Sequence, residues 1–408
     1  MTDKEGFAAM GSHDFIRFPP ALAQFSARTW LLLGEIQATA QTVRVSPILP
    51  AHSYELENQY LAKGIHGTTA IMGNSFSEDE AAKLIDGELP AYASRIADLR
   101  QIKNMAEAFN MVARDEMFGG PSLFSLEKLN RYHELVMNGL GESNGGQIQV
   151  GALREHRVEV GAYLAPPPEA IKPLIEQYCD WLNADEEASH DLDGYDIARA
   201  IIKALVAHVS FVWIYPYGDG NGRMARLIEH AILLRAGLPE ACTHVLSYFY
   251  SKTRRQYYAE LQRSHGEYVH GAYPPVGDLR NFVEYALEGF MDELSDLMLV
   301  IGSMQVQAIW RDHIRACFPS ILTTMQQRRM RLALDLTDRC VDQPVILEVV
   351  REVSAAIELE YADESDAVLA GDLDALVKMD LLIHDDRGYQ PNPALMLSLF
   401  GNSGLNQT

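Results

Sequence analysis

Glycines stand at every second position, Gly218, Gly220 and Gly222, in the segment Tyr215-Pro-Tyr-Gly-Asp-Gly-Asn-Gly-Arg223 between two periodic apolar stretches. Glycine lets the backbone turn tightly and approach a ligand, so the N–H groups of this loop can converge on an anion. A helix that begins after the loop adds the unpaired N–H groups and the positive dipole end of its first turn. The loop is therefore predicted to cradle a polyphosphate.

Charged side chains in this segment fit an anion and a hard cation. Arg223 and Arg226 are three residues apart, on nearly one face of the first helical turn. Cations are unfavourable at that end of a helix unless an anion compensates them. Asp219 is placed to hold Mg²⁺ against phosphate oxygens, and Asn221 is a neutral hydrogen-bond partner. A Gly-rich turn could also be a plain connector, and the two arginines favour binding.

The elements around the loop read mostly as helices, because apolar residues recur at three- and four-residue spacing. The segments with this pattern are 22–39, 79–85, 99–118, 126–137, 171–182, 195–213, 222–236 and 278–304. Strand signals are few, and the clearest is the alternating stretch at Val158-Glu-Val160, which predicts a hairpin. The sequence therefore predicts an all-α fold with one short β-hairpin.

The chain from about Trp310 onward is expected to be a separate unit. It reads as a helix, a short strand, two helices and a hairpin, an order that suits a winged helix; these elements are 327–338, 344–346, 347–356, 366–379 and 381–389. The presumed recognition helix carries Asp366, Asp372 and Asp374 with only Lys378 as a basic residue, which would attract phosphate poorly. A protein-contact or structural role is favoured over DNA binding.

Composition bounds the function classes. The chain has 408 residues, 48% of them hydrophobic, and 34 Lys+Arg against 56 Asp+Glu give a formal charge of -22, which disfavours a nucleic-acid partner. The four cysteines are scattered, which favours reduced thiols over a metal site or disulfide framework. The N-terminus lacks the pattern of a signal peptide, and no window has the roughly 18 apolar residues of a spanning helix. We expect a cytoplasmic location and no membrane partner.

The segment from Tyr215 to Arg226 resembles the signature of the Fic (Fido) family, His-Pro-Phe-x-Asp/Glu-Gly-Asn-Gly-Arg-x-x-Arg. The resemblance extends from Gly67 to Leu261, because Gly67-Thr-Thr-Ala-Ile-Met-Gly-Asn74 looks like the family's inhibitory-helix motif. It implies a Fic-fold helical core with a hairpin flap. The predicted parts are an N-terminal helical region at 1–110, the Fic core at 111–300 and the winged-helix-like domain at 310–400.

Typical members of this family transfer AMP from ATP to a hydroxyl side chain of a target protein. The resemblance implies that Asp219 holds Mg²⁺ and that Asn221 contacts the α-phosphate of ATP. It also implies that Arg223 and Arg226 contact the outer phosphates. The expected partners are a nucleotide and an unidentified target protein.

Two departures from the pattern fall on functional positions. Tyr215 stands where the family has the histidine that acts as general base. The pKa of a phenol is near 10 against about 6.5 for imidazole, so keeping the basic form at pH 7 would cost about 4 kcal/mol. Met72 stands at the inhibitory position, where autoinhibited members carry a glutamate that pairs with the second arginine. Without that glutamate, Arg226 is expected to be free for the outer phosphate.

No other histidine is expected to replace the base. His208 lies two helical turns before the loop and is expected in the core, His230 lies in the third turn of the following helix, and His156 is expected to be exposed. Three functions remain open. The chain is a nucleotide-binding protein with impaired or lost AMP transfer, an active transferase with altered chemistry, or a non-catalytic interaction protein.

Overall fold

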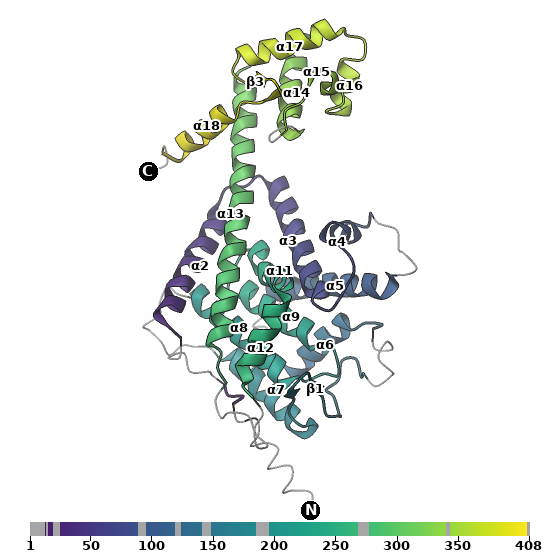
Figure 1. Cartoon of the computed structure of the whole chain (residues 1–408), viewed down its shortest axis with the longest axis vertical. Helices are drawn as coiled ribbons and strands as arrows, with labels where there is room; N and C mark the ends of the chain where they lie inside the picture. The colour runs from purple at the N-terminus through teal and green to yellow at the C-terminus, as the bar shows by residue number, and fades with distance from the viewer. Residues whose placement is uncertain are drawn as a thin grey trace, which may run out of the picture. The chain divides into compact units, whose positions relative to one another are not determined.

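The computed structural model describes residues 13, 15–18, 25–88, 95–118, 124–140, 148–184, 196–267, 277–339 and 343–405 (Figure 1). The chain divides into two compact units. Unit 1 comprises residues 1–46 and 53–297, and unit 2 comprises residues 47–52 and 298–408. The expected division at residue 110 lies inside helix α5 (Ile96–Phe118), so the N-terminal region and the expected core share one unit.

Unit 1 is helical, which confirms the predicted fold class. Its helices are α2 (Ala27–Val45), α3 (Pro50–Ala70), α4 (Glu78–Ile85), α5, α6 (Leu126–Val136), α7 (Pro168–Asn183), α8 (Asp196–Ile214), α9 (Asn221–Arg235), α10 (Glu240–Thr243), α11 (Val245–Lys252), α12 (Arg254–His265) and the first half of α13 (Arg280–Ala316). The predicted hairpin is present as β1 (Glu159–Val160) and β2 (Tyr163–Leu164), antiparallel, with Val160 opposite Tyr163. Helix α3 has no counterpart among the segments predicted from periodicity.

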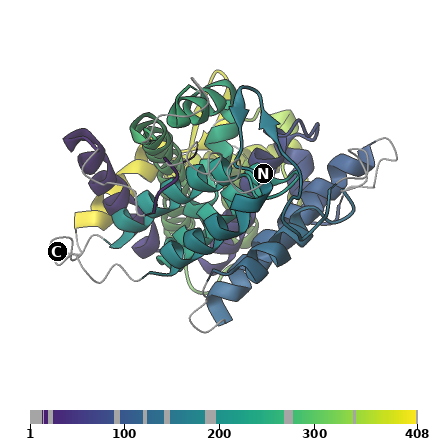
Figure 2. The ribbon, with the colours of Figure 1, turned by 90° about the horizontal axis from the view of Figure 1, so that it is seen from below.

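Helix α8 forms the centre of unit 1. Most of its side chains are buried, because the sequence is predominantly apolar after the first turns. By length and composition it is the one helix of the described residues that could cross a membrane, yet most of it lies inside the protein core. It packs along α9 and also contacts α2, α7 and α12. Figures 1 and 2 show α2 and α5 on opposite sides of the α8–α9 pair.

The ends of several helices follow from local sequence. Ser77 and Glu80 form a reciprocal capping box at the start of α4, and Ser125 caps α6 by accepting from the N–H of Lys128. At α9 the preceding residue is Gly220, whose φ of 78° is left-handed, and no side chain caps the helix. The first N–H groups of α9 are thus not satisfied by a capping side chain.

Unit 2 resembles the order expected from its sequence, except that the helix expected at 347–356 is two short helices and that a further helix follows the hairpin. It holds the end of α13 and α14 (Thr324–Arg339), α15 (Leu347–Val350), α16 (Ala355–Glu360), α17 (Asp366–Lys378), the hairpin β3 (Leu382–Asp385) and β4 (Gly388–Pro391), and α18 (Pro393–Leu405). Val345 pairs with Tyr389 as an isolated antiparallel bridge, where a short strand was predicted. The name winged helix remains a prediction for this unit.

The acidic face of α17 is smaller than its sequence suggests, because Asp372 points into unit 2. Its carboxylate is 2% exposed and accepts hydrogen bonds from Arg328 Nε at 2.8 Å, Arg329 Nε at 2.6 Å and the Tyr361 hydroxyl at 3.0 Å. Asp374 on the same helix is exposed. Asp372 is therefore part of the structural core of unit 2.

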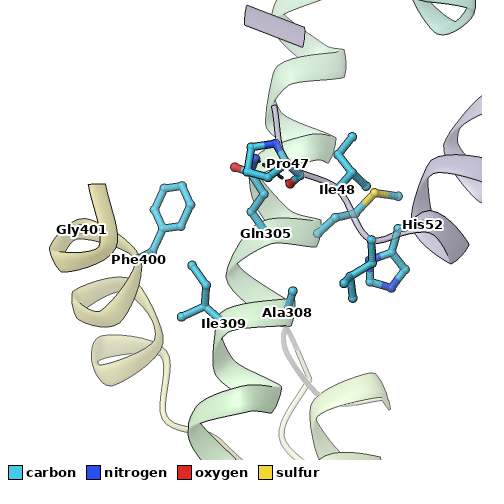
Figure 3. A pocket seen from close by; sticks show the side chains of 10 residues that line it. Pro47, Ile48, His52, Gln305, Ala308, Ile309, Phe400 and Gly401 are labelled. Carbon is cyan, nitrogen blue, oxygen red and sulfur yellow. Dashed lines mark hydrogen bonds between the residues drawn. The ribbon is translucent and has the colours of Figure 1, made fainter. Parts of the chain in front are cut away.

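Unit 2 also contains an open apolar cavity of about 680 Å³ between the segment 47–52, α13 and α18. Figure 3 shows Ile309 of α13 and Phe400 of α18 at this cavity, with Gln305 beside Pro47. The Gln305 amide donates to the carbonyl oxygen of Pro47 at 3.1 Å. None of the site residues predicted from the sequence lines this cavity.

Three cysteines lie in the described residues as free thiols. Cys179 and Cys242 are buried and Cys317 is exposed, while Cys340 lies outside the described residues. Burial raises the pKa of the Cys179 and Cys242 thiols to about 12, so both stay protonated near neutral pH.

Candidate nucleotide site

The predicted loop forms one wall of a cavity of about 400 Å³ in unit 1. Residues from the loop and the start of α9 line it together with residues from the β-hairpin, the end of α8, α12 and the turn after α3; they include Met72, Gly161, Tyr215, Asp219, Asn221, Gly222, Arg226, Tyr257 and Tyr258. Three regions that are far apart in the sequence therefore meet at the loop. Of the predicted site residues, Gly218, Gly220 and Arg223 do not line this cavity.

Asn221 holds the loop in its turn. Its side-chain oxygen accepts from the N–H of Tyr217 at 3.0 Å, and its amide nitrogen donates to the carbonyl of Tyr217 at 2.8 Å. Asp219 accepts from the N–H of Gly220 at 2.6 Å through Oδ1. These bonds shape the backbone so that the first turn of α9 faces the cavity.

The buried ring of Tyr217 anchors the loop in the core of unit 1. It is buried, stacks on the imidazole of His133 with 3.8 Å between ring centroids, and donates its hydroxyl to Asn130 Oδ1 at 2.9 Å. His133 accepts from the N–H of Gly151 at 3.0 Å and so donates from Nε2 to the carbonyl of Asp219, also at 3.0 Å. Burial lowers the pKa of His133 to about 4, which keeps the ring neutral.

Arg223 is a buried cation, and two of its guanidinium nitrogens make no hydrogen bond to the described residues. Its side chain is 4% exposed, and its Nη2 atom lies 3.1 Å from the sulfur of Met137 and 3.8 Å from Asp219 Oδ2. Its Nε and Nη1 atoms are buried and make no hydrogen bond to any described residue. Burial lowers the pKa of this guanidinium, because a buried charge is poorly solvated. Such unpartnered donors are costly unless a ligand accepts from them.

Arg226 is held in place by neutral partners. It is 1% exposed, and Nε donates to the Thr68 hydroxyl at 2.7 Å, Nη2 to the Thr68 carbonyl at 3.1 Å and Nη1 to the Tyr257 hydroxyl at 3.2 Å. Thr68 lies near the end of α3, within the segment that resembles the inhibitory motif. Met72 lines the cavity and is 41% exposed. With methionine at position 72 these partners of Arg226 are neutral, and its availability to an outer phosphate stays a prediction.

Tyr215 lines the cavity in the position that the sequence predicted for the general base. Its φ of 48° is left-handed, an uncommon conformation for a bulky residue. Burial, and then the negative charge of Asp219, raise the pKa of its phenol above the ordinary value. The surroundings of Tyr215 therefore reduce the fraction of its phenol that is deprotonated at neutral pH.

Arg154 fixes the backbone at Tyr215 although its sequence position gave no sign of this role. Its Nε donates to the Tyr215 carbonyl at 2.8 Å, Nη1 to the His156 carbonyl at 2.6 Å and Nη2 to the Pro166 carbonyl at 2.6 Å. The side chain is buried, and its own N–H donates to the carbonyl of Pro216. Arg154 thus joins the segment before the hairpin to the loop.

The donor set allows a divalent cation only together with a ligand. Of the residues described as lining the cavity, Asp219 is the one carboxylate, and the described residues contain no group of three or more His, Cys, Asp or Glu side chains that could hold a metal ion. Mg²⁺ is commonly bound by one or two carboxylates plus substrate phosphates. The site therefore fits Mg²⁺ as a companion of a bound polyphosphate.

The other histidines lie where the sequence placed them. His208 is fully buried, with Nδ1 2.8 Å from Glu229 Oε2 and Nε2 2.9 Å from the Tyr257 hydroxyl. His230 is buried against His244. His156 is exposed, although its ring lies 3.5 Å from where a Cβ atom on Gly218 would be. Of these three, only His156 is next to the loop.

Sequence reasoning missed Thr68, His133, Arg154 and Tyr257. A weak signal existed for His133, because it shares the buried face of α6 with Leu129 and Val136. A histidine on an apolar helix face needs a polar partner. The other three contact backbone carbonyls or side chains more than 30 residues away, which periodicity cannot show.

The region that contains the loop matches a known protein family. Residues 123–233 match the Fic/DOC family. The protein adenylyltransferase fic-1 of Caenorhabditis elegans is 26% identical over 244 residues, 60% of this chain and 42% of that protein. The protein adenylyltransferase Fic of Nematostella vectensis is 27% identical over 205 residues, 50% of this chain and 43% of that protein. This chain therefore spans about two fifths of the length of these relatives.

Among solved structures, a Fic family protein from Desulfovibrio desulfuricans has a similar fold. Its crystal structure superposes with a TM-score of 0.55 at 18% identity, covering 92% of this chain and 98% of that one. At this identity the likeness shows the fold alone. The matched family region contains all of α8, the loop and most of α9.

Proposed function

Residues 123–233 form a Fic/DOC family domain, and from this premise we propose that the chain binds ATP with Mg²⁺ at the start of α9 and has lost most of the AMP transfer typical of its relatives. The observation that carries the binding claim is the buried guanidinium of Arg223 with two unpartnered donor atoms beside the uncapped first turn of α9. A phosphate bound at this helix end would accept from these donors and from the first N–H groups of the helix.

Each part of the site has a role in this proposal. The N–H groups at Asn221 and Gly222 and the side chain of Arg226, all of residues that line the cavity, would bind the phosphates, and the unpartnered donors of Arg223 would join them. Asp219 would hold Mg²⁺, which would neutralise charge on the phosphates during transfer of AMP. The target protein would approach along the β-hairpin, because Gly161 and its neighbours line the same cavity.

The missing step is proton removal from the target hydroxyl. A positioned general base usually contributes about 10²- to 10⁴-fold to a rate. The environment of Tyr215 raises the pKa of its phenol, so the fraction in the basic form near pH 7 is smaller than the roughly one in a thousand of a free tyrosine. We infer an adenylyltransferase-like protein that binds nucleotide and transfers AMP slowly or not at all.

Isothermal titration with ATP and Mg²⁺ tests this proposal. The unaltered protein should bind ATP, and Arg226→Ala should weaken binding. Arg235→Ala is the matched control, because Arg235 lies on the same helix and pairs with Glu116 outside the cavity. Absence of ATP binding, or equal affinity in the two variants, would remove the basis of the proposal.

A second candidate is an active transferase in which the hydroxyl of Tyr215 itself accepts AMP from ATP, with pyrophosphate as the leaving group, since the side chain lines the cavity. With radiolabelled ATP, self-labelling that disappears in Tyr215→Phe would support this chemistry. Equal labelling in both proteins would exclude participation of the tyrosine hydroxyl.

A further inference from the structure

The guanidinium of Arg226 has donors left after it is held in place. A guanidinium carries five N–H groups. Thr68 and Tyr257 accept from one N–H on each of its three nitrogen atoms, so one N–H remains on each terminal nitrogen. Both terminal nitrogens lie beside Gly222, at 3.4 and 3.7 Å from where a Cβ atom there would be, and Gly222 and Arg226 line the same cavity. Arg226 can thus bind a phosphate without leaving its present partners.

Tyr257 connects Arg226 to a buried carboxylate. Since Arg226 Nη1 must donate, the Tyr257 oxygen accepts and its own hydrogen goes to His208 Nε2, 2.9 Å away. His208 then donates from Nδ1 to Glu229 Oε2 at 2.8 Å. The Glu229 carboxylate is therefore linked to Arg226 through Tyr257 and His208 and does not occupy the donors that face the loop.

Thr68 holds Arg226 from the other side, on a helix end that is closely packed. A Cβ atom on Gly67 would lie 2.5 Å from the carbonyl oxygen of Ser247, and one on Gly64 would lie 2.6 Å from His244 Nδ1. The backbone of α3 can approach these groups only because both positions are glycine. The carbonyl and hydroxyl of Thr68 are fixed by this packing.

We propose that the end of α3 supports the nucleotide site, and that Thr68 and Tyr257 are positioning residues that aim two N–H groups of Arg226 at the outer phosphates of a bound nucleotide. This inference rests on the proposed nucleotide binding. A supporting role and an inhibitory role of this helix predict opposite effects on nucleotide affinity when the contact is removed. An inhibitory contact competes with the phosphate for Arg226, so its removal strengthens nucleotide binding. A contact that positions Arg226 has the opposite effect, and its removal weakens nucleotide binding.

Thr68→Val distinguishes the positioning role from the inhibitory role, because it deletes the hydroxyl acceptor at nearly constant side-chain volume. Binding of ATP, ADP and AMP, each with Mg²⁺, is measured by isothermal titration. Loss of a hydrogen bond that orients a charged group should weaken ATP binding by about tenfold or more. AMP lacks the outer phosphates and should bind Thr68→Val and the unaltered protein equally.

Thr69→Val is the matched control. Thr69 is buried on the same helix, and its hydroxyl donates to the carbonyl of Ile65 at 2.8 Å. It should leave all three affinities unchanged. Thr68→Ser keeps the hydroxyl and should retain ATP affinity. In an Arg226→Ala background, Thr68→Val should have no further effect on ATP binding, because the hydroxyl acts through Arg226.

Tyr257→Phe is the second variant, for the case that Thr68→Val does not fold, and it should also weaken ATP binding more than AMP binding. Unchanged or tighter ATP binding by Thr68→Val overturns the support role, as does an equal loss for ATP and AMP. If the unaltered protein binds no ATP, the proposed function fails and this inference falls with it. If it binds ATP through Arg226 without Thr68, only this inference fails.

Discussion

The Nε atom of Arg154 donates to the carbonyl oxygen of Tyr215 across 2.8 Å, and this bond joins the segment before the hairpin to the residue at the base position. The same guanidinium donates to two further backbone carbonyls. A left-handed tyrosine backbone is unfavourable by itself, so its neighbours must hold it. The shape of the site therefore depends on a residue outside the Fic signature.

Arg154→Met should destabilise the protein, because three carbonyls lose a charged donor in a buried place. We expect the free energy of unfolding to fall by roughly 2–4 kcal/mol in urea titrations. Arg157→Met is the control, since Arg157 is exposed on the same segment. Equal stability of the two variants would show that Arg154 does not hold the loop.

Arg223→Met should separate stability from binding. The substitution removes a buried charge with unpartnered donors, so the free energy of unfolding should stay the same or rise by up to about 2 kcal/mol. ATP affinity should fall at least about tenfold, because the phosphates lose a charged donor. Urea unfolding and isothermal titration measure the two effects. A large loss of stability would mean that Arg223 is a structural residue.

His230 should make the folded state sensitive to acid. Burial, and then the nearby His244, lower the pKa of His230 well below its ordinary value of about 6.5. Below that pH the unfolded chain takes up a proton that the folded chain refuses. Stability is therefore full above pH 6.5 and falls below it, by at most about 1.4 kcal/mol per pH unit from this residue.

His230→Leu should remove this part of the pH dependence, which urea unfolding from pH 7 to pH 5 can measure. His156→Leu is the comparison, because His156 is exposed. Parallel stability curves for His230→Leu and the unaltered protein would contradict the assignment.

Asp372→Asn should weaken unit 2 without affecting the nucleotide site. The carboxylate accepts from two arginines and a tyrosine while nearly fully buried, so its neutralisation should cost roughly 2–4 kcal/mol. Differential scanning calorimetry should show a lower Tm for one transition, while ATP affinity stays constant. Asp374→Asn, on the exposed face of α17, should change neither.

The strongly periodic parts of the chain could be predicted from sequence. The predicted helices at 195–213 and 222–236 agree with α8 and α9 to within a residue at each end, because apolar spacing and glycines mark them on both sides. Helix α3 was missed as a helix, since Gly64 and Gly67 lower helix propensity. Those glycines are needed for close packing against Ser247 and His244, which the local sequence does not reveal.

The sequence predicted several loop residues that line the cavity, but it did not predict the distant residues that hold Arg226. Asp219, Asn221 and Arg226 line the cavity as expected. The partners of Arg226 are Thr68, 158 residues away, and Tyr257, 31 residues away. Such contacts depend on how helices pack in three dimensions, so sequence spacing could not show these partners of Arg226.

The central claim is that the phosphate-binding groups are intact and the general base is missing. Tyr215→His tests it most directly, with transfer of label from α-phosphate-labelled ATP to protein as the measurement. Histidine accepts the left-handed backbone at this position more readily than tyrosine. We predict a gain of about a hundredfold or more over the unaltered protein, lost again when Arg226→Ala is added. A Tyr215→His variant that binds ATP as tightly as the unaltered protein but gains no transfer would contradict the claim.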